Sequence, residues 1–301
     1  MHIPDGFLTN RIALSMDVLS GASVLLAAHR LKLESAMRLI PMMGVFSSFV
    51  FAAQMLNFPV FGGTSGHLVG GALVGILLGP MAGLLTMATV IIAQALFLQD
   101  GGLVALGANL FNIGAVSVLI GYTVYRLFGS PEAKGKRLSA AGFVAGWFSV
   151  VVSAAACALE LGLSGAVPLK VGLPAMAGYH AVIGLVEGGL TAGVLSFLVR
   201  ARPDFLKKEA APRFGFWDGV GGLILVAIPL AFLALAGSSS LPDPLQALLP
   251  EPVAGAIEQE SILSPGRADD LNRVLLYIGI LVVGAIALLA ARRLTSRGRP
   301  S

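Results

Sequence analysis

The chain has one cysteine, few aromatic residues and few charged ones. Because Cys157 is alone, the sequence offers neither an intramolecular disulfide framework nor a cluster of thiolate ligands. Charged residues make up 12% of the chain and aromatic residues 7%, whereas 56% are hydrophobic and the mean hydropathy is +0.87. Soluble domains carry roughly 25% charged residues. The composition therefore excludes an ordinary soluble domain and predicts an all-α polytopic membrane protein.

Two motifs that would change this interpretation are missing. The first ten residues, MHIPDGFLTN, hold an acid and a proline where a secretory signal needs basic residues and an apolar core, so we expect Met1 to be retained. No Walker A sequence occurs, since the nearest candidate, Gly129 to Lys136, has the wrong spacing. Energy from ATP would have to come from another chain. We also find no internal repeat, which gives no support to an inverted-repeat carrier.

Apolar stretches predict nine membrane crossings, grouped as a seven-helix core and two further helices. We expect a membrane subunit at 1–200, a cytoplasmic linker at 201–217 and a two-helix module with an extracytoplasmic loop at 218–301. The third stretch is short, since about eleven residues rise only about 17 Å against a hydrocarbon core of about 30 Å. The nine stretches are Arg11 to Ala28, Leu39 to Leu56, Leu68 to Leu78, Met81 to Leu98, Leu103 to Tyr125, Leu138 to Leu163, Leu173 to Val199, Val220 to Ala236 and Val274 to Leu289.

The basic residues set the expected orientation. With the amino terminus outside, sixteen of the twenty Lys and Arg residues fall on the cytoplasmic side, as the positive-inside rule requires. Counting the short third stretch as a crossing is necessary for this result. The net charge of +4 thus reflects topology, and we expect no nucleic-acid partner. The predicted location is the inner (cytoplasmic) membrane, in contact with the lipid bilayer.

The first two residues form a potential metal chelator. If Met1 is unblocked, its amine and the amide nitrogen of His2 close a five-membered ring on a metal, and His2 Nδ1 closes a six-membered ring. This planar nitrogen set suits Ni(II) or Cu(II), with Co(II) possible, and leaves one equatorial position open. The alternative is that His2 is a solvated terminal residue.

A second histidine could fill the open position. The segment NFPVFGGTSGHLVGG places His67 in a glycine-rich loop before the short third crossing, on the same outer side as Met1. Irregular backbone at membrane depth is tolerated where protein or a water-filled cavity satisfies it, so we expect this loop to dip inward. The alternative is a simple glycine-rich turn whose histidine bonds a carbonyl group.

Four motifs, in order, make the chain resemble a known family. MHIPDGFL, NFPVFGGTSGHLVGG, QDGGLVALGANLFNIG and YHAVIGLVEGGLTAG are similar to segments of the membrane substrate-binding subunit of cobalt and nickel energy-coupling-factor transporters. The resemblance covers the chain up to about Val199. It implies that Met1, His2 and His67 bind the ion, and that an extra amino-terminal helix precedes a six-helix core.

The resemblance also implies partners and a division of labour. Cytoplasmic ATPase subunits would hydrolyse ATP, a transmembrane coupling protein would transmit the energy, and this chain would capture extracytoplasmic Ni(II) or Co(II) as the transported substrate. The chain would then be no enzyme and have no cofactor of its own. The shared ligands leave nickel and cobalt open, although the general affinity order favours nickel. Small residues at Gly71, Gly75, Ala82 and Gly83 are predicted to contact the coupling protein.

The carboxyl-terminal module resembles an accessory component sometimes fused to these subunits. Related extensions carry a Pro-Asp-Gly-Leu-Glu signature. Pro242, Asp243 and Leu245 match it, whereas Pro244 and Gln246 depart from it. The role of the module therefore stays open.

One enzymatic alternative and several polar residues remain. Gly63 to Gly66 spells GxSG, which resembles intramembrane serine proteases and would make Ser65 the nucleophile and His180 the base. Ionisable residues inside membrane helices are costly and often functional, but a structural network is favoured for His180 with Glu187. Side chains that could instead be second-shell groups or interhelical links are Gln54, Asn57, Asn109 and Asn112, and no role is assigned to Asp17 or Glu160.

Overall fold

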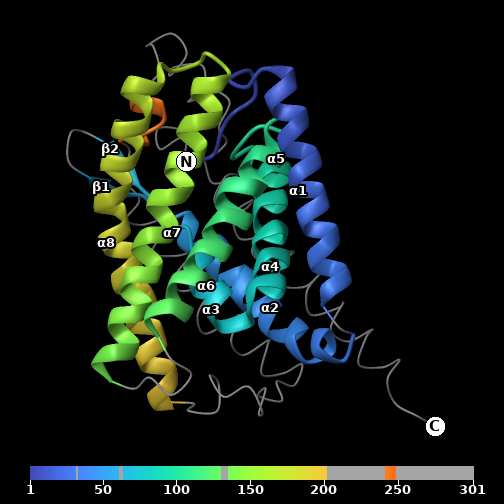
Figure 1. Cartoon of the computed structure of the whole chain (residues 1–301), viewed down its shortest axis with the longest axis vertical. Coiled ribbons are helices and arrows are strands. Elements are labelled where there is room, and N and C mark those ends of the chain that lie inside the picture. The colour runs from blue at the N-terminus through green and yellow to red at the C-terminus, as the bar shows by residue number, and fades with distance from the viewer. Residues whose placement is uncertain (32, 61–63, 130–134, 202–240, 249–301) are drawn as a thin grey trace, which may run out of the picture.

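The computed structural model describes residues 1–31, 33–60, 64–129, 135–201 and 241–248, which form a bundle of helices (Figure 1). The linker and the last two predicted crossings lie outside these residues, apart from 241–248. The helices and strands are α1 (Asn10–Arg30), α2 (Leu33–Gln54), β1 (Phe58–Val60), β2 (Thr64–Gly66), α3 (Gly71–Leu78), α4 (Pro80–Ala93), η2 (Gln94–Leu98), α5 (Leu106–Asn109), η3 (Leu110–Val116), α6 (Ser117–Phe128), α7 (Lys136–Leu163), α8 (Leu169–Ala201) and η5 (Gln246–Leu248).

The helical membrane fold is confirmed. In the described parts of the chain, five helices are long and apolar enough to cross a membrane: α1, α4 with η2, α5 to α6, α7 and α8. Their positions match predicted crossings one, four, five, six and seven. The second crossing corresponds to α2, whose apolar part, 39–54, is shorter. The exposed leucines of α1, such as Leu14 and Leu25, are those expected of a surface that faces lipid.

The third crossing is only partly helical. Helix α3 has eight residues and is therefore about 12 Å long. It ends at Gly79, which has a φ of +81° that favours glycine, and Pro80 opens α4 as its first residue. The loop before α3 supplies the rest of the path. This loop contains the antiparallel β1–β2 pair, in which Pro59 lies opposite Ser65.

Small residues allow the helices to approach closely. A Cβ atom on Gly146 of α7 would lie 2.9 Å from the Cα atom of Gly188 in α8. The same holds inside the α3–α4–α6 group, where a Cβ atom on Gly75 would lie 2.9 Å from the carbonyl oxygen of Val118. A side chain at either glycine would force the helices apart.

The prediction that the small residues of α3 and α4 contact a coupling protein is wrong. A Cβ atom on Gly83 would lie 3.1 Å from the Cα atom of Gly75, so these two glycines pack against each other. Gly71 lies against Ser117, and Ala82 is buried. All four small residues face the interior because α3 needs close neighbours on every side. These four residues serve the fold, and none of them is exposed to a partner.

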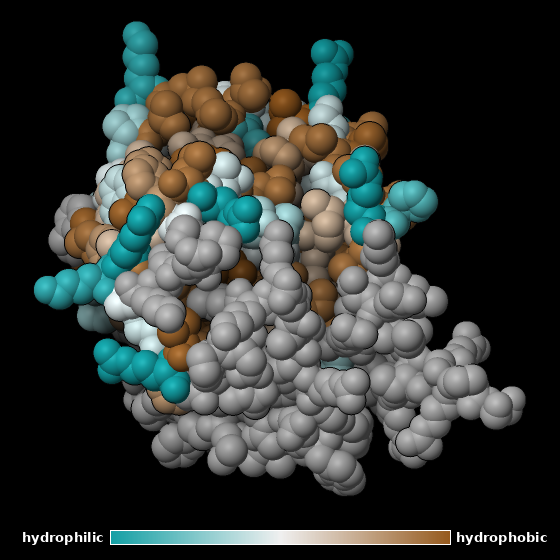
Figure 2. Space-filling view, turned by 60° about the horizontal axis from the view of Figure 1, so that its bottom comes forward, coloured by the Kyte–Doolittle hydropathy of each residue, from teal (hydrophilic) through white to brown (hydrophobic). Residues whose placement is uncertain are grey.

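The helix ends at the lower end of the bundle in Figure 1 carry several basic residues. Exposed residues at helix ends there are Arg30, Arg126, Lys136, Arg137 and Arg200. Figure 2 brings this end forward and shows hydrophilic side chains projecting from it among apolar ones. The amino terminus lies toward the opposite end, below the upper ends of α1 and α8 (Figure 1).

Candidate metal centre

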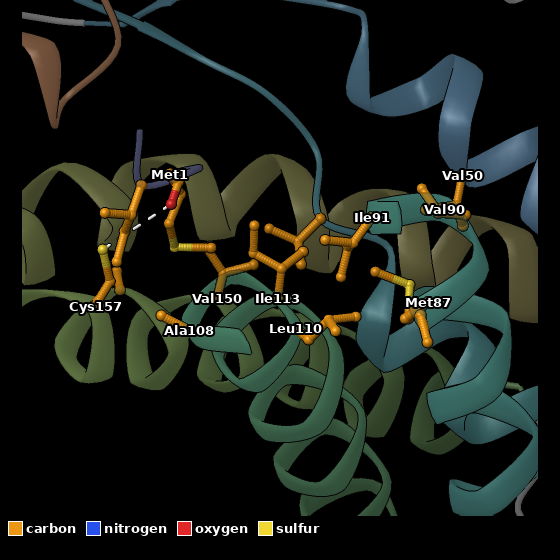
Figure 3. Packing of buried hydrophobic residues seen from close by; sticks show 14 of the residues in the cluster. Met1, Val50, Met87, Val90, Ile91, Ala108, Leu110, Ile113, Val150 and Cys157 are labelled. Atoms are coloured by element: carbon orange, nitrogen blue, oxygen red, sulfur yellow. Dashed lines mark hydrogen bonds between the residues drawn. The ribbon is translucent and has the colours of Figure 1, made fainter. Parts of the chain in front are cut away.

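The amino terminus is buried inside the bundle. Met1 is 1% exposed and Ile3 is fully buried. Figure 3 shows the side chain of Met1 beside Val150 and Ile113, at one end of a row of buried apolar residues that continues to Met87. Burial of two large apolar side chains on either side of His2 stabilises this position by roughly 1.5–3 kcal/mol each. Apolar packing thus brings the terminal amine into the protein.

Asn109 holds the backbone just after His2. Its side chain accepts a hydrogen bond from the Ile3 N–H at 2.7 Å and donates one to the Ile3 carbonyl oxygen at 3.0 Å. Gly102 N–H donates to the same carbonyl at 2.9 Å. Gly101 has a φ of +94°, and a Cβ atom there would lie 2.7 Å from Asn109 Nδ2. Glycine at 101 therefore lets this loop approach the terminal segment.

Asp5 provides a second anchor. Its carboxylate accepts hydrogen bonds from the N–H groups of Leu103, Val104 and Ala105 at 2.8–3.1 Å. These donors directly precede α5, where free N–H groups and the helix dipole favour a negative charge. The motif MHIPDG therefore places its acid where it can hold the first turn of the fifth crossing.

The loop that carries His67 is held through its backbone. Glu187 of α8 accepts hydrogen bonds from Val69 N–H at 2.9 Å and Gly70 N–H at 2.7 Å. Gln54 of α2 donates to the Val69 carbonyl oxygen at 2.7 Å. Gly70 has a φ of +81° before α3 begins, which favours glycine at this turn. The loop is thus fixed between α2 and α8.

These two segments bring together the three predicted ligand residues. The Met1 amine lies 3.1 Å from His67 Nε2, and the rings of His2 and His67 stack with centroids 5.5 Å apart and planes 19° apart. His67 Nδ1 lies 2.9 Å from the Leu68 carbonyl oxygen, which can only accept a hydrogen bond, so Nδ1 carries the proton and donates. The lone pair of neutral His67 is therefore on Nε2, which faces the amine.

Two carboxylates border this group. Asp243 Oδ2 lies 2.9 Å from the Met1 amine, and Asp100 Oδ1 lies 3.3 Å from His2 Nδ1. A cavity of about 420 Å³ is lined by His2, both carboxylates and Asp5. Within the described residues, no three His, Cys, Asp or Glu side chains cluster as metal ligands. The predicted set would not form such a cluster, because it has two imidazoles and takes its other nitrogens from the backbone.

The electrostatics keep both imidazoles neutral. Burial and, to a smaller extent, the charged Met1 amine lower the pKa of His2 to about 3, although Asp243 and Gln94 oppose the change. Burial, the same amine and His2 lower the pKa of His67 to about 4. Burial alone would raise the pKa of Asp243, but the Met1 amine and the Gln246 N–H outweigh it and lower the pKa to about 2. At neutral pH the histidines hold lone pairs and Asp243 is charged.

Residues 241–248 lie directly against the centre. Ser65 N–H donates to the Pro242 carbonyl oxygen at 2.8 Å, and Ser65 Oγ donates to the Leu241 carbonyl oxygen at 2.6 Å. Asp243 also accepts from Gln246 N–H and bonds the Gln246 side chain through its own N–H. Asp243 was considered in the sequence only as part of an imperfect signature. Its contact with Met1 had no sequence signal, because the two are 242 residues apart.

The structure does not support the protease alternative. Ser65 Oγ donates to a carbonyl oxygen, and His180 Nδ1 pairs with the Met176 carbonyl oxygen. Glu187 binds the His67 loop and has no contact with His180 among the described hydrogen bonds, so the predicted His180–Glu187 network is not formed directly. The described residues therefore contain no Ser65–His180 pair.

The remaining polar predictions fall into separate roles. Asn109 and Gln54 support the centre, as described above. Asn112 donates to Glu160 at 2.7 Å, which joins η3 to α7, and Asp17 accepts from Gly107 N–H at 3.0 Å, which joins α1 to α5. These last pairs link helices. Two supporting residues, Asp100 and Gln94, carried no individual sequence signal.

A family model described as the cobalt uptake substrate-specific transmembrane region, CbiM, matches residues 2–205. The chain belongs to this family. It is a multi-pass membrane protein of cobalt and nickel transport, and it is a transporter component and not an enzyme.

Individual relatives of this CbiM family chain agree. A relative from Archaeoglobus fulgidus, whose name refers to fused nickel transport, NikMN, is 44% identical over 78% of this chain and 75% of its own length. The fused nickel transport protein NikMN of Rhodobacter capsulatus is 31% identical over 78% of this chain and 73% of its own. The cobalt transport protein CbiM of Sorangium cellulosum is 33% identical over 69% of this chain and 95% of its own.

A solved structure supports the fold. The crystal structure of a truncated transition metal transporter superposes with a TM-score of 0.60 and is 32% identical in sequence. The match covers 67% of this chain and 99% of that one.

Proposed function

We propose that this chain captures Ni(II) or Co(II) on the outer side of the membrane through Met1, His2 and His67. The ligands are the terminal amine, the amide nitrogen and Nδ1 of His2, and Nε2 of His67. The observation that carries the proposal is the 3.1 Å separation between the Met1 amine and His67 Nε2. Two nitrogens in adjacent positions, each about 2.0 Å from one ion, lie about 2.8 Å apart. Small movements would therefore complete the set.

The donors favour nickel over cobalt. Four nitrogens in one plane, one of them an ionised amide, suit Ni(II), and Ni(II) also stands above Co(II) in the general affinity order. The relatives of this chain include proteins named for nickel and proteins named for cobalt. Copper would bind still more tightly in solution, so its exclusion falls to availability or to the shape of the centre.

Import requires partners that hydrolyse ATP. The proposed complex has two cytoplasmic ATPase subunits and a transmembrane coupling protein, because the chain has no Walker A sequence of its own. The amino terminus faces outward in this scheme, since five exposed basic residues lie at described helix ends at the other end of the bundle, against Arg11 and Lys170 at this end. Residues 218–301 form an accessory module, and the contact of Pro242 and Asp243 with the centre supports its participation in capture.

Calorimetry on the purified full-length protein tests the ligand set. Nickel should bind at one site, and His67→Ala should weaken binding by more than the roughly 100-fold that loss of a supporting residue costs. His29→Ala is the matched control, because His29 lies at the far end of α1. Equal affinities of native protein and His67→Ala would refute the assignment. Uptake of each ion by the reconstituted complex would decide between nickel and cobalt.

A further inference from the structure

Two buried polar atoms near the centre have no hydrogen-bond partner of standard geometry: His2 Nε2 and Gln94 Oε1. Gln94 opens η2 and is fully buried, and its side chain is near enough to the His2 ring to oppose the lowering of that ring's pKa. A buried polar group without a partner is destabilising, because it has lost its bonds to water. A ring N–H and a carboxamide oxygen are complementary, so one bond between them would satisfy both atoms.

The orientation of the Gln94 carboxamide follows from its neighbours. The Val69 carbonyl can only accept, so the group of Gln54 that lies 2.7 Å from it must be the NH₂. Gln54 then presents its oxygen to Gln94 at 2.8 Å, which requires the NH₂ of Gln94 on that side. Gln94 is left with an oxygen toward His2. Each hydrogen bond therefore fixes the orientation of the next carboxamide, because the series starts at the Val69 carbonyl oxygen, which can only accept.

We propose that Gln94 is a positioning residue that holds His2 in the tautomer with its proton on Nε2. The inference rests on the proposed function, because that tautomer leaves the lone pair on Nδ1, the atom that closes the chelate ring. A metal-binding imidazole commonly gives its other N–H to an acceptor, which fixes both tautomer and ring orientation. In this centre the acceptor is an amide oxygen from η2.

Asp100 is the competing acceptor. Its distance of 3.3 Å from His2 Nδ1 exceeds the usual 2.7–3.2 Å range for such bonds. The Asp100 side chain is also 30% exposed, so water can satisfy it, whereas Gln94 has no access to water. The larger cost therefore falls on leaving Gln94 without its bond, which favours the proton on Nε2.

The same hydrogen-bond series reaches the other ligand. Val69, whose carbonyl begins the series, also donates its N–H to Glu187 and lies two residues after His67. The position of the His67 loop thus determines the tautomer of His2. The two imidazoles are prepared together, although they come from distant parts of the chain.

Nitrogen NMR of histidine side chains in the metal-free, full-length protein tests the tautomer directly. The resonance of His2 is assigned by its loss in His2→Ala, among four histidines in the chain. We expect native His2 at neutral pH to carry its proton on Nε2. Gln94→Leu should move the proton in part to Nδ1, toward Asp100, and lower nickel affinity about 10–100-fold.

Gln94→Glu separates this role from simple packing. It keeps an acceptor beside the ring, so His2 should keep the Nε2 proton and more of its nickel affinity than Gln94→Leu. A packing role predicts the reverse order, since Leu is apolar and Glu adds a buried acid. A native protein with the proton on Nδ1, or a Gln94→Leu protein with unchanged tautomer, overturns the proposal. A tautomer that follows Gln94 in a protein that binds no nickel supports the hydrogen bond and overturns metal capture.

Discussion

The two segments that meet at the centre are fixed in different ways. The amino-terminal segment inserts apolar side chains, Met1 and Ile3, and is held by Asn109 and by its own Asp5. The His67 loop also buries two apolar side chains, Leu68 and Val69, and its backbone is tied to polar side chains, Gln54 of α2 and Glu187 of α8. The first segment supplies one polar anchor of its own, Asp5, whereas the polar anchors of the loop both lie in helices, α2 and α8.

This difference indicates what each segment contributes. The terminal segment supplies three of the four proposed nitrogens, so it must sit deep and in one register. The loop supplies one imidazole, and its position is adjusted through two buried polar side chains. Changes to the ligand atoms of the first segment should therefore remove binding, and changes to the supports of the loop should weaken it.

The largest effect is expected from one residue added before Met1. The Met1 amine would become an amide nitrogen. The added residue would also need space beside Met1, which is only 1% exposed. Nickel binding measured by calorimetry should be lost, while the protein stays folded by circular dichroism. A carboxyl-terminal extension of the same length is the control. Native affinity in the amino-terminally extended protein would show that the amine is no ligand.

The next largest effect is expected from pH, because the nitrogens of the amino-terminal segment release protons when nickel binds, whereas the His67 imidazole does not. Binding displaces a proton from the amine and one from the amide of His2, so affinity should rise about tenfold per pH unit for each proton released. His67 should contribute nothing between pH 6 and 8, because its pKa of about 4 leaves it neutral throughout. The same holds for the His2 ring, whose pKa is about 3. Calorimetry in buffers of different ionisation enthalpy counts the protons. A break in affinity near the ordinary histidine pKa of about 6.5 would contradict this account.

The Glu187→Ala variant should weaken binding about 10–100-fold, since two backbone N–H groups of the His67 loop lose their acceptor. Glu187→Gln is the matched control, because its oxygen can still accept one of the two bonds and the loss should be smaller. Both are measured by nickel titration. Equal affinity of Glu187→Ala and the native protein would mean that the loop is held by Gln54 alone.

The smallest effect is expected for Asp5→Ala. The carboxylate is exposed and caps the N–H groups before α5, and loss of a cap costs about 0.5–2 kcal/mol. Water can replace it in part, so nickel affinity should fall by about tenfold or less. Asp5→Asn keeps an acceptor, so its nickel affinity should lie between those of the native protein and Asp5→Ala. If Asp5→Ala lowers affinity more than Glu187→Ala, the terminal segment depends on its polar anchor more than on its buried apolar side chains.

Much of this could be predicted from the sequence. Hydropathy gave the long helices because lipid imposes the same apolar requirement on each, and the motifs around Met1, His2 and His67 gave the centre. Asp243 and Gln94 could not be found in that way. Their roles depend on contacts between segments 242 and 92 residues apart, which no local pattern encodes. The inward-facing Gly75 and Gly83 were misassigned because small residues look the same in a buried helix contact and in a surface for a partner.

The ion pair between Met1 and Asp243 has a consequence for the charge balance of capture. An uncharged amide and an ammonium group together carry one positive charge. After a divalent ion replaces their two protons, the ion, the ionised amide and the neutral amine again carry one positive charge. Asp243 therefore faces the same net charge before and after loading. The exchange is electroneutral, so the affinity of a centre partly buried at membrane depth would not depend on the voltage across the membrane when the protons leave by the side from which the ion enters.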